Sequence, residues 1–146
     1  MKHVTDHNKI VEIQFQRSKQ RIYAMDLDHN GDYRLVAEYE CRDAFYAGYN
    51  EHGELRASLP NGTYEHVYAE ITDGCYGSAY GNFYITTGDS RGRDIHGGGS
   101  GLNEPYADYQ GWQPTLGCLR MQNVDGVELS AMIIASGNDV VLTVVE

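Results

Sequence analysis

Apolar residues in this chain occur in short runs, and in its first half they alternate with polar residues. Residues 11–16 place Val11, Ile13 and Phe15 between polar neighbours, which is the period of a β-strand with one buried face. Even the longer apolar runs, such as residues 131–135, are far shorter than the roughly 20 residues of a membrane-spanning helix. The pattern predicts a mostly β domain without a membrane span. Further strands are predicted at residues 21–25, 33–39, 44–49, 63–71, 83–87 and 139–145.

One helix is predicted near the C-terminus. It begins near Asn123 or Asp125, either of which is a good N-cap residue, and Gly137 is a natural stop. The length of 146 residues fits a single domain spanning residues 1–146. We therefore expect a β-rich α+β fold with one main helix. The formal net charge of −10 argues against binding to nucleic acid or to an anionic membrane, since both need clustered Lys and Arg.

A polar turn at residues 26–32 separates two of the predicted strands. Asp26, Asp28 and Asn30 stand where an EF-hand loop has its first ligands. The bidentate Glu that closes such a loop is replaced by Ala37. The Asn-Gly pair within the turn is typical of a β-hairpin instead. We predict a hairpin turn here and no metal site in the chain.

The chain has three cysteines, Cys41, Cys75 and Cys118. None belongs to a CxxC pair, so neither a structural zinc site nor a thioredoxin-type motif is predicted. A disulfide between Cys41 and Cys75 stays open, because spacing alone does not decide it. The odd count leaves at least one free thiol, and a free cysteine beside a base is a candidate nucleophile.

Two segments, one around His96 and one around Cys118, carry the residues that cysteine chemistry needs. Cys118 is the predicted nucleophile and His96 the predicted general base. A backbone carbonyl near Gly97 is expected to orient the imidazole. The N–H groups of Gly117 and Cys118 are candidates for an oxyanion hole, because glycine permits a tight turn with exposed amides.

Together the two segments resemble the catalytic region of the L,D-transpeptidases of the YkuD type. That family has a His-Gly pair, a loop, and then Ser/Thr-His-Gly-Cys followed by Arg or Asn and a further Asn. Its upstream Thr-Pro-Xaa-Gly-Xaa-Tyr element is similar to residues 59–64. The resemblance implies a YkuD-type β-sandwich or barrel-like domain whose helix follows the cysteine motif. The matching positions are His96, Gly97, Thr115, Gly117, Cys118, Leu119, Arg120 and Asn123.

The resemblance also implies an activity and a substrate. Cys118 would attack a peptidoglycan stem peptide at the carbonyl of its third, diamino acid residue, and His96 would protonate the departing D-amino acid. The amine of a second stem would resolve the thioester into a cross-link, whereas water would make the enzyme an L,D-carboxypeptidase. No cofactor is implied. The expected substrate contacts are Thr115, Arg120, Trp112 and Tyr84.

Two departures from the family pattern keep a second class of function open. Leu116 replaces the motif histidine, and Cys118 follows His96 by 22 positions, which is more than the usual family spacing. The first departure leaves open a non-catalytic peptidoglycan-binding domain that keeps the same groove. The longer loop carries aromatic residues such as Tyr106 and Trp112, which we expect to form a lid or a substrate wall.

The substrate implies a site of action in the cell wall or periplasm. Residues 1–15 lack the apolar core and the small-residue cleavage site of a secretory leader. We therefore expect a chain trimmed of its leader, or delivery by a phage or a secretion system.

Overall fold

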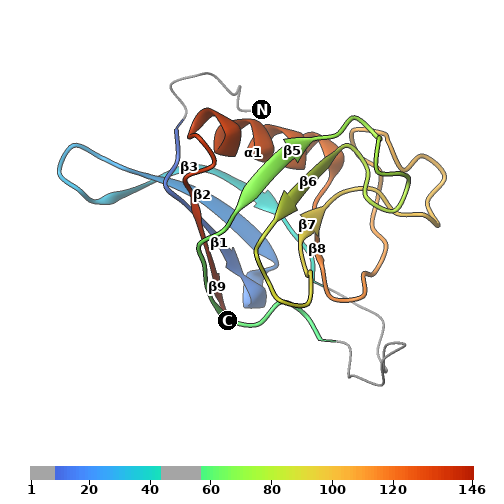
Figure 1. Ribbon diagram of the computed structural model, residues 1–146, viewed down its shortest axis with the longest axis horizontal. Helices are drawn as coiled ribbons and strands as arrows, with labels where there is room; N and C mark the ends of the chain where they lie inside the picture. Colours follow the sequence, from blue (N-terminus) through green and yellow to red (C-terminus); the bar gives the residue numbers. More distant parts are fainter. Residues whose placement is uncertain (1–8, 44–56) are drawn as a thin grey trace.

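The computed structural model describes residues 9–43 and 57–146, which form two β-sheets and one α-helix. In chain order the elements are β1 (Glu12–Gln16), η1 (Arg17–Lys19), β2 (Arg21–Leu27), β3 (Tyr33–Glu40), β4 (Gly62–Tyr64), β5 (Tyr68–Ile71), β6 (Phe83–Thr86), β7 (Ile95–His96), β8 (Leu119–Arg120), α1 (Asn123–Ala135) and β9 (Val141–Val145). Figure 1 shows α1 lying across the top of the molecule, above strands of both sheets. The predicted β-rich α+β fold is confirmed. No helix in the described part of the chain is long and apolar enough to cross a membrane.

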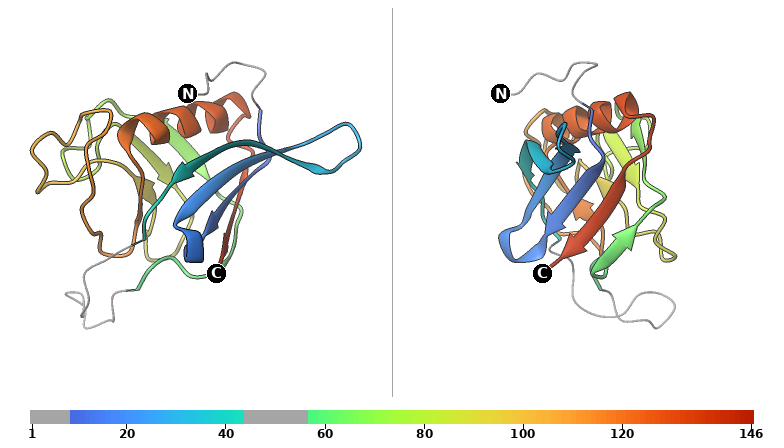
Figure 2. Two further views of the ribbon diagram at one scale, coloured as in Figure 1. Left: turned by 180° about the vertical axis from the view of Figure 1, so that it is seen from behind. Right: turned by 90° about the vertical axis from the view of Figure 1, so that its left-hand side faces the viewer.

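The larger sheet has five strands in the order β3-β2-β1-β9-β4. Its central strand β1 pairs antiparallel with β2 and parallel with β9, so segments far apart in the sequence lie side by side. Figure 2 shows these strands face on in its right-hand view. The alternation that predicts β1 buries Ile13 and Phe15. In β9 the same period buries Leu142 and Val144, so the two strands contribute to one core.

A long hairpin joins β2 to β3 and extends beyond the body of the molecule (Figure 1, Figure 2). The Asp28 carboxylate closes its turn by accepting hydrogen bonds from the N–H groups of Asn30 and Asp32, at 2.8 and 3.0 Å. Gly31 has a φ of +83°, a conformation that favours glycine. The hairpin predicted at residues 26–32 is therefore confirmed.

The smaller sheet has four strands in the order β5-β6-β7-β8, and β7 and β8 are two residues long. Alternation predicts neither of them, because two residues show no period. The single strand predicted at residues 63–71 is wrong, since β4 pairs with β9 in the larger sheet and β5 pairs with β6 in the smaller one. The chain changes sheets between them. The strand predicted at residues 44–49 lies outside the described residues.

The helix α1 packs against β5 and β6. Gly126 makes this packing close, because a Cβ at its position would overlap the ring of Phe83. The N-cap position is held by Gln122, and no side-chain cap is formed among the described residues. The prediction that Asn123 or Asp125 caps the helix is therefore wrong.

The Asn123 side chain ties loops together instead of capping α1. Its amide nitrogen donates to the carbonyls of Pro105 and Ala107, both at 2.8 Å. Its amide oxygen accepts a hydrogen bond from the N–H of Asn82 at 3.0 Å. These bonds compete with capping because one short side chain cannot serve both, and they anchor the long loop between β7 and β8 to the start of the helix.

Candidate active site

The loops that follow β5 and β7 gather at the end of the molecule opposite the β2–β3 hairpin (Figure 1). There β7 and β8 form a parallel pair. The Leu119 N–H donates to the Asp94 carbonyl at 2.9 Å, and the Met121 N–H donates to the His96 carbonyl at 3.0 Å. This pairing brings His96 and Cys118 to a cavity of about 320 Å³. The described residues that line it are Ala79, Tyr80, His96, Ser100, Gln113, Pro114, Thr115, Leu116, Cys118 and Arg120.

His96 is 4% exposed and lies among aromatic rings. The ring centroid of Tyr84 is 6.1 Å from that of the imidazole in a stacked arrangement, and Tyr80 meets it edge-on at 5.1 Å. Nδ1 lies 2.9 Å from the Gly97 carbonyl oxygen; since this oxygen only accepts, Nδ1 carries the proton and Nε2 is the basic nitrogen. Burial lowers the pKa of His96 to about 4. The Arg120 charge also lowers this pKa, whereas the hydrogen bond to the Gly97 carbonyl raises it. The imidazole is therefore neutral at pH 7.

The Cys118 thiol is partly buried and accepts a hydrogen bond from the Asp94 N–H, with 3.4 Å between nitrogen and sulfur. The sulfur lies 4.0 Å from the Gly92 carbonyl oxygen. Burial raises the pKa of this thiol; the Asp94 N–H and the Arg120 charge lower it, and the Asp94 carboxylate raises it further. Cys118 and His96 are therefore a neutral thiol and a neutral imidazole at pH 7.

Thr115 holds the turn that precedes Cys118. Its hydroxyl donates to the Cys118 carbonyl at 2.6 Å and accepts from the Gly117 N–H at 3.3 Å. Gly117 has a φ of +126°, and a Cβ there would lie 2.6 Å from the Ala57 carbonyl oxygen, so glycine alone fits. Of the two candidate oxyanion donors, the Gly117 N–H is bound to Thr115, and the Cys118 N–H meets no acceptor within residues 9–43 and 57–146.

Arg120 is buried, and its guanidinium ties the β5–β6 loop to both ends of the β7–β8 loop through their backbone carbonyls. Nε donates to Gly97 at 3.3 Å, Nη2 donates to Ala79 at 3.1 Å, and Nη1 donates to Gln113. Arg120 lines the cavity, where a substrate contact is predicted. Its bonds to carbonyls also hold in place the Gly97 oxygen that orients His96.

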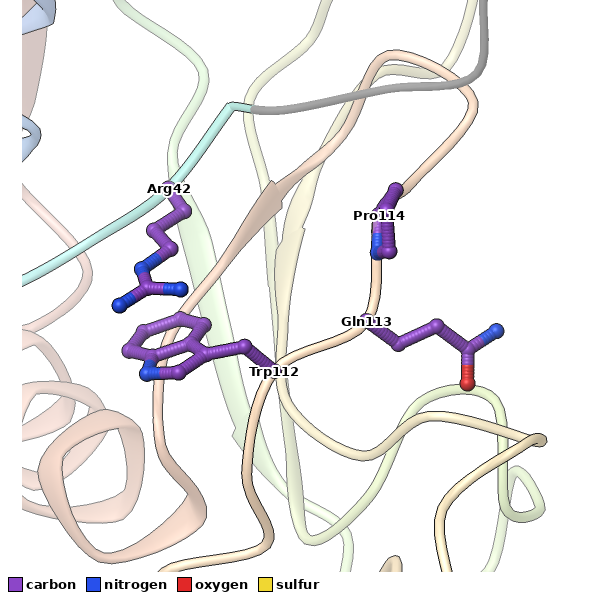
Figure 3. A pocket seen from close by; sticks show the side chains of 4 residues that line it. All are labelled: Arg42, Trp112, Gln113 and Pro114. Atoms are coloured by element: carbon purple, nitrogen blue, oxygen red, sulfur yellow. The ribbon is translucent and has the colours of Figure 1, made fainter.

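Two of the expected substrate contacts do not line this cavity. Tyr84 stacks on His96, and its hydroxyl donates to Asp94 Oδ2 at 2.7 Å. Trp112 packs under Arg42 in an adjoining pocket of about 140 Å³ (Figure 3). The tertiary structure thus places the Tyr84 ring against His96 and the Trp112 ring in the adjoining pocket, and neither ring lines the cavity itself.

Asp94 is a site residue that the sequence analysis misses. Its carboxylate is buried and accepts hydrogen bonds from the Thr87 N–H at 3.0 Å, the Thr87 hydroxyl at 3.3 Å and the Tyr84 hydroxyl at 2.7 Å. Its own N–H is the donor to Cys118. The available signal was an acidic residue two positions before His96, in a short segment between loops.

The remaining thiols lie away from this chemistry. Cys41 is buried in the core and Cys75 is exposed, and all three cysteines are free, so the disulfide left open by the sequence is not formed. In the described ranges, no group of three or more His, Cys, Asp and Glu side chains is arranged to hold a metal ion.

No family model matches the sequence, and no curated protein matches it. Solved structures match its fold. Bd1075 of Bdellovibrio bacteriovorus does so with a TM-score of 0.62 at 14% identity, over 95% of this chain and 49% of that one. The helical cell shape determining protein Pgp2 of Campylobacter jejuni matches with a TM-score of 0.62 at 15% identity, over 92% of this chain and 47% of that one.

An L,D-transpeptidase from Xylanimonas cellulosilytica matches with a TM-score of 0.55 at 16% identity, over 99% of this chain and 64% of that one. This chain shares their fold. At identities of 14–16% the likeness is one of fold, and the chain spans about half the length of Bd1075 and Pgp2. The resemblance to the L,D-transpeptidases therefore holds at the level of architecture.

Proposed function

We propose that this domain is a cysteine-dependent L,D-transpeptidase that acts on peptidoglycan stem peptides. The observation that carries the proposal is the convergence of His96 and Cys118 on one cavity. Each has a partner suited to its role, the Gly97 carbonyl at Nδ1 and the Asp94 N–H at the sulfur. The fold shared with an L,D-transpeptidase supports the same reaction class. The site of action that follows is the cell wall or periplasm.

In the proposed first half-reaction, Cys118 Sγ attacks the carbonyl of the third residue of the stem peptide. The S–H proton passes to Nε2 of His96, which accepts it because the imidazole is neutral at pH 7. The C–N bond to the terminal D-amino acid then breaks, and the imidazolium gives its proton to the leaving amine. The Cys118 N–H is the proposed donor to the oxyanion.

In the second half-reaction, the side-chain amine of another stem attacks the thioester carbonyl and gives a proton to His96 Nε2. An amide bond forms, the C–S bond breaks, and the Cys118 sulfur takes the proton back. Water in place of the amine releases a carboxylic acid, which is the L,D-carboxypeptidase outcome. The two reactions use the same residues and differ in the acceptor.

Leu116 motivates the competing proposal of a non-catalytic binding domain, since the family has a histidine there. The turn, however, has other support: the Thr115 hydroxyl binds both the Cys118 carbonyl and the Gly117 N–H. Leu116 is 58% exposed, so its side chain contributes little to holding the turn. These contacts favour an enzyme over a binding domain.

Incubation with defined muropeptides, followed by mass spectrometry, tests the proposal. A tetrapeptide donor and an acceptor stem should give a cross-linked dimer and a free D-amino acid, whereas tripeptide and free D-amino acid without any dimer would identify a carboxypeptidase. Cys118→Ala should abolish both products. Cys75→Ser is the matched control, because it removes an exposed thiol elsewhere in the chain and should leave both products unchanged.

A carbapenem provides an independent readout of the nucleophile. It should acylate Cys118, giving one adduct in the intact mass of Cys75→Ser and none in Cys118→Ala. Native protein as inert as Cys118→Ala toward both carbapenem and muropeptides would reject the enzyme in favour of a binding domain.

A further inference from the structure

A second pocket adjoins the Cys118 cavity, because Gln113 and Pro114 line both. Its volume is about 140 Å³, and among the described residues Arg42 and Trp112 line it as well. Figure 3 shows the Arg42 guanidinium over the Trp112 indole, while the Gln113 side chain turns away from both. The guanidinium carbon lies 4.2 Å from the indole centroid, within the range of a cation–π contact. The pocket thus offers a charged group beside apolar rings.

The backbone holds Arg42 next to the reactive cysteine. Arg42 and Arg120 form an isolated antiparallel bridge, with N–H to carbonyl distances of 2.9 and 2.8 Å. Arg120 comes two residues after Cys118, so this bridge couples the position of Arg42 to the site. The Arg42 side chain remains 42% exposed and accessible to a ligand.

One edge of the Arg42 guanidinium is paired with the Glu40 carboxylate, and another edge is available to a ligand. Nε and Nη2 both contact Glu40 Oε2, at 2.7 and 2.6 Å, which fixes the plane of the group over Trp112. Nη1 meets no acceptor among residues 9–43 and 57–146. Arg120, in contrast, donates to backbone carbonyls from all of its nitrogens. Of these two guanidinium groups, Arg42 presents a donor to a ligand.

The size and chemistry of the pocket restrict what it holds. A cavity of roughly 150 Å³ holds a benzene-sized group, so a short aliphatic group fits here and a sugar residue does not. The faces of Trp112 and Pro114 suit the aliphatic part, and Nη1 of Arg42 suits a carboxylate. Because the net charge of the chain is −10, a carboxylate needs such a local cation to be held.

We propose that the Arg42–Trp112 pocket is a specificity subsite for a carboxylate carried on a short aliphatic residue of the peptide that reacts at Cys118. The identity of that peptide, a stem peptide, rests on the proposed function. The subsite binds and positions the peptide, and takes no part in bond making or breaking.

The fluorescence of Trp112 reports on this pocket, because it is the only tryptophan of the chain. The probes are a stem tetrapeptide with free carboxylates and the same tetrapeptide with its carboxylates amidated, titrated into Cys118→Ala protein. The free acid should change the fluorescence and bind about tenfold more tightly than the amide. A hydrogen bond to a charged group contributes enough binding free energy for a tenfold difference in Kd. Adding Arg42→Gln should abolish that preference.

Arg34→Gln is the matched control for the lost charge. Arg34 is also exposed and also paired with a carboxylate, Asp26 at 3.7 Å, but it lies on the β2–β3 hairpin. Protein that carries Arg34→Gln together with Cys118→Ala should keep the tenfold preference for the free acid. In turnover assays Arg42→Gln should raise the KM for the free acid about tenfold and change kcat less than about twofold, whereas a merely structural role would lower kcat as well.

The outcomes separate this subsite from the proposed reaction. Equal binding of acid and amide, or equal effects of Arg42→Gln and Arg34→Gln, would overturn the subsite. If a carbapenem forms no adduct at Cys118 while the acid still binds through Arg42, the proposed function fails and the subsite stands. If the adduct forms and both peptides bind alike, the reaction stands and the subsite fails.

Discussion

The two sheets of this domain share one apolar core but differ in the length of their strands and in what fastens the loops around them. The larger sheet has strands of up to eight residues, and buried side chains of both sheets, such as Phe15 and Phe83, belong to one core. The smaller sheet ends in two strands of two residues each. Its surrounding loops are fastened by side-chain hydrogen bonds to backbone groups, chiefly from Arg120 and Asn123. Burial of apolar area stabilises both sheets, and specific polar contacts shape the loops around the second.

This difference explains where the candidate site lies. A regular ladder satisfies its own backbone groups and leaves few of them for a ligand. The short strands β7 and β8 leave a histidine and a cysteine at the borders of turns, where amides and carbonyls are available. Substitutions in the larger sheet should therefore change stability, and those around His96 and Cys118 should change chemistry.

Cys118→Ala is expected to have the largest effect. Turnover of muropeptides should fall at least about a thousandfold because the nucleophile is gone, while the free energy of unfolding changes by less than about 1 kcal/mol. Phe15→Leu is its counterpart in the larger sheet, and it should cost about 1 kcal/mol of stability while kcat of the folded protein is unchanged. Steady-state kinetics and denaturant unfolding measure both quantities. Similar losses of activity in the two variants would contradict the distinction between the sheets.

Buried His96 should make the protein sensitive to acid. Its pKa is about 4 in the folded protein against an ordinary 6.5, so between these pH values the unfolded chain binds a proton that the folded one does not. The free energy of unfolding should fall by about 3 kcal/mol as the pH drops from 6.5 to 4. His96→Gln should remove this part of the pH dependence. Denaturant unfolding at a series of pH values measures the difference, and parallel curves would contradict it.

Gly126→Ala tests the packing of α1 on the smaller sheet. The added methyl group would overlap the buried Phe83 ring, so unfolding should become easier by about 2 kcal/mol despite the gain in helix propensity. Ser130→Ala on the same helix is the control. The Ser130 hydroxyl is buried without a hydrogen-bond partner among the described residues, so its removal should leave stability equal or higher. Thermal unfolding compares them, and equal midpoints for the two variants would contradict the close contact.

Leu116→His should have the smallest effect. It restores the histidine of the family motif, but Thr115 already holds the turn, so turnover should change less than about twofold. Thr115→Val, which removes the hydroxyl bound to the Cys118 carbonyl, should cost about 1 kcal/mol of stability and lower turnover more than any change at Leu116. A large gain of activity in Leu116→His would mean that the histidine, and not Thr115, is what the turn requires.

Much of the fold follows from local patterns in the chain. Alternation predicts β1, short strand-like segments predict β2, β3, β6 and β9, and the segment that begins near Asn123 and stops at Gly137 predicts α1. The error at residues 63–71 arises because local pattern carries no information about which sheet a strand joins. The misplaced cap at Asn123 has the same origin, since loops remote in sequence occupy its side chain.

The candidate site was accessible to sequence analysis only where a motif marked it. His96 and Cys118 stand in short signatures with glycine neighbours, and both line the cavity. Asp94 and Arg42 belong to no such signature. Their positions depend on hydrogen bonds across strands, to Cys118 in one case and to Arg120 in the other.

The amino-acid sequence by itself determined the period of the strands, the one long helix and the pair of residues proposed for the chemistry. Those are local properties, set by alternation, turn residues and short motifs. The tertiary structure decided that β7 and β8 pair in parallel, which brings together residues 22 positions apart. It also decided the protonation of the pair, because burial lowers the pKa of His96 and raises that of Cys118. Burial is a property of the folded chain, and no spacing of residues encodes it directly.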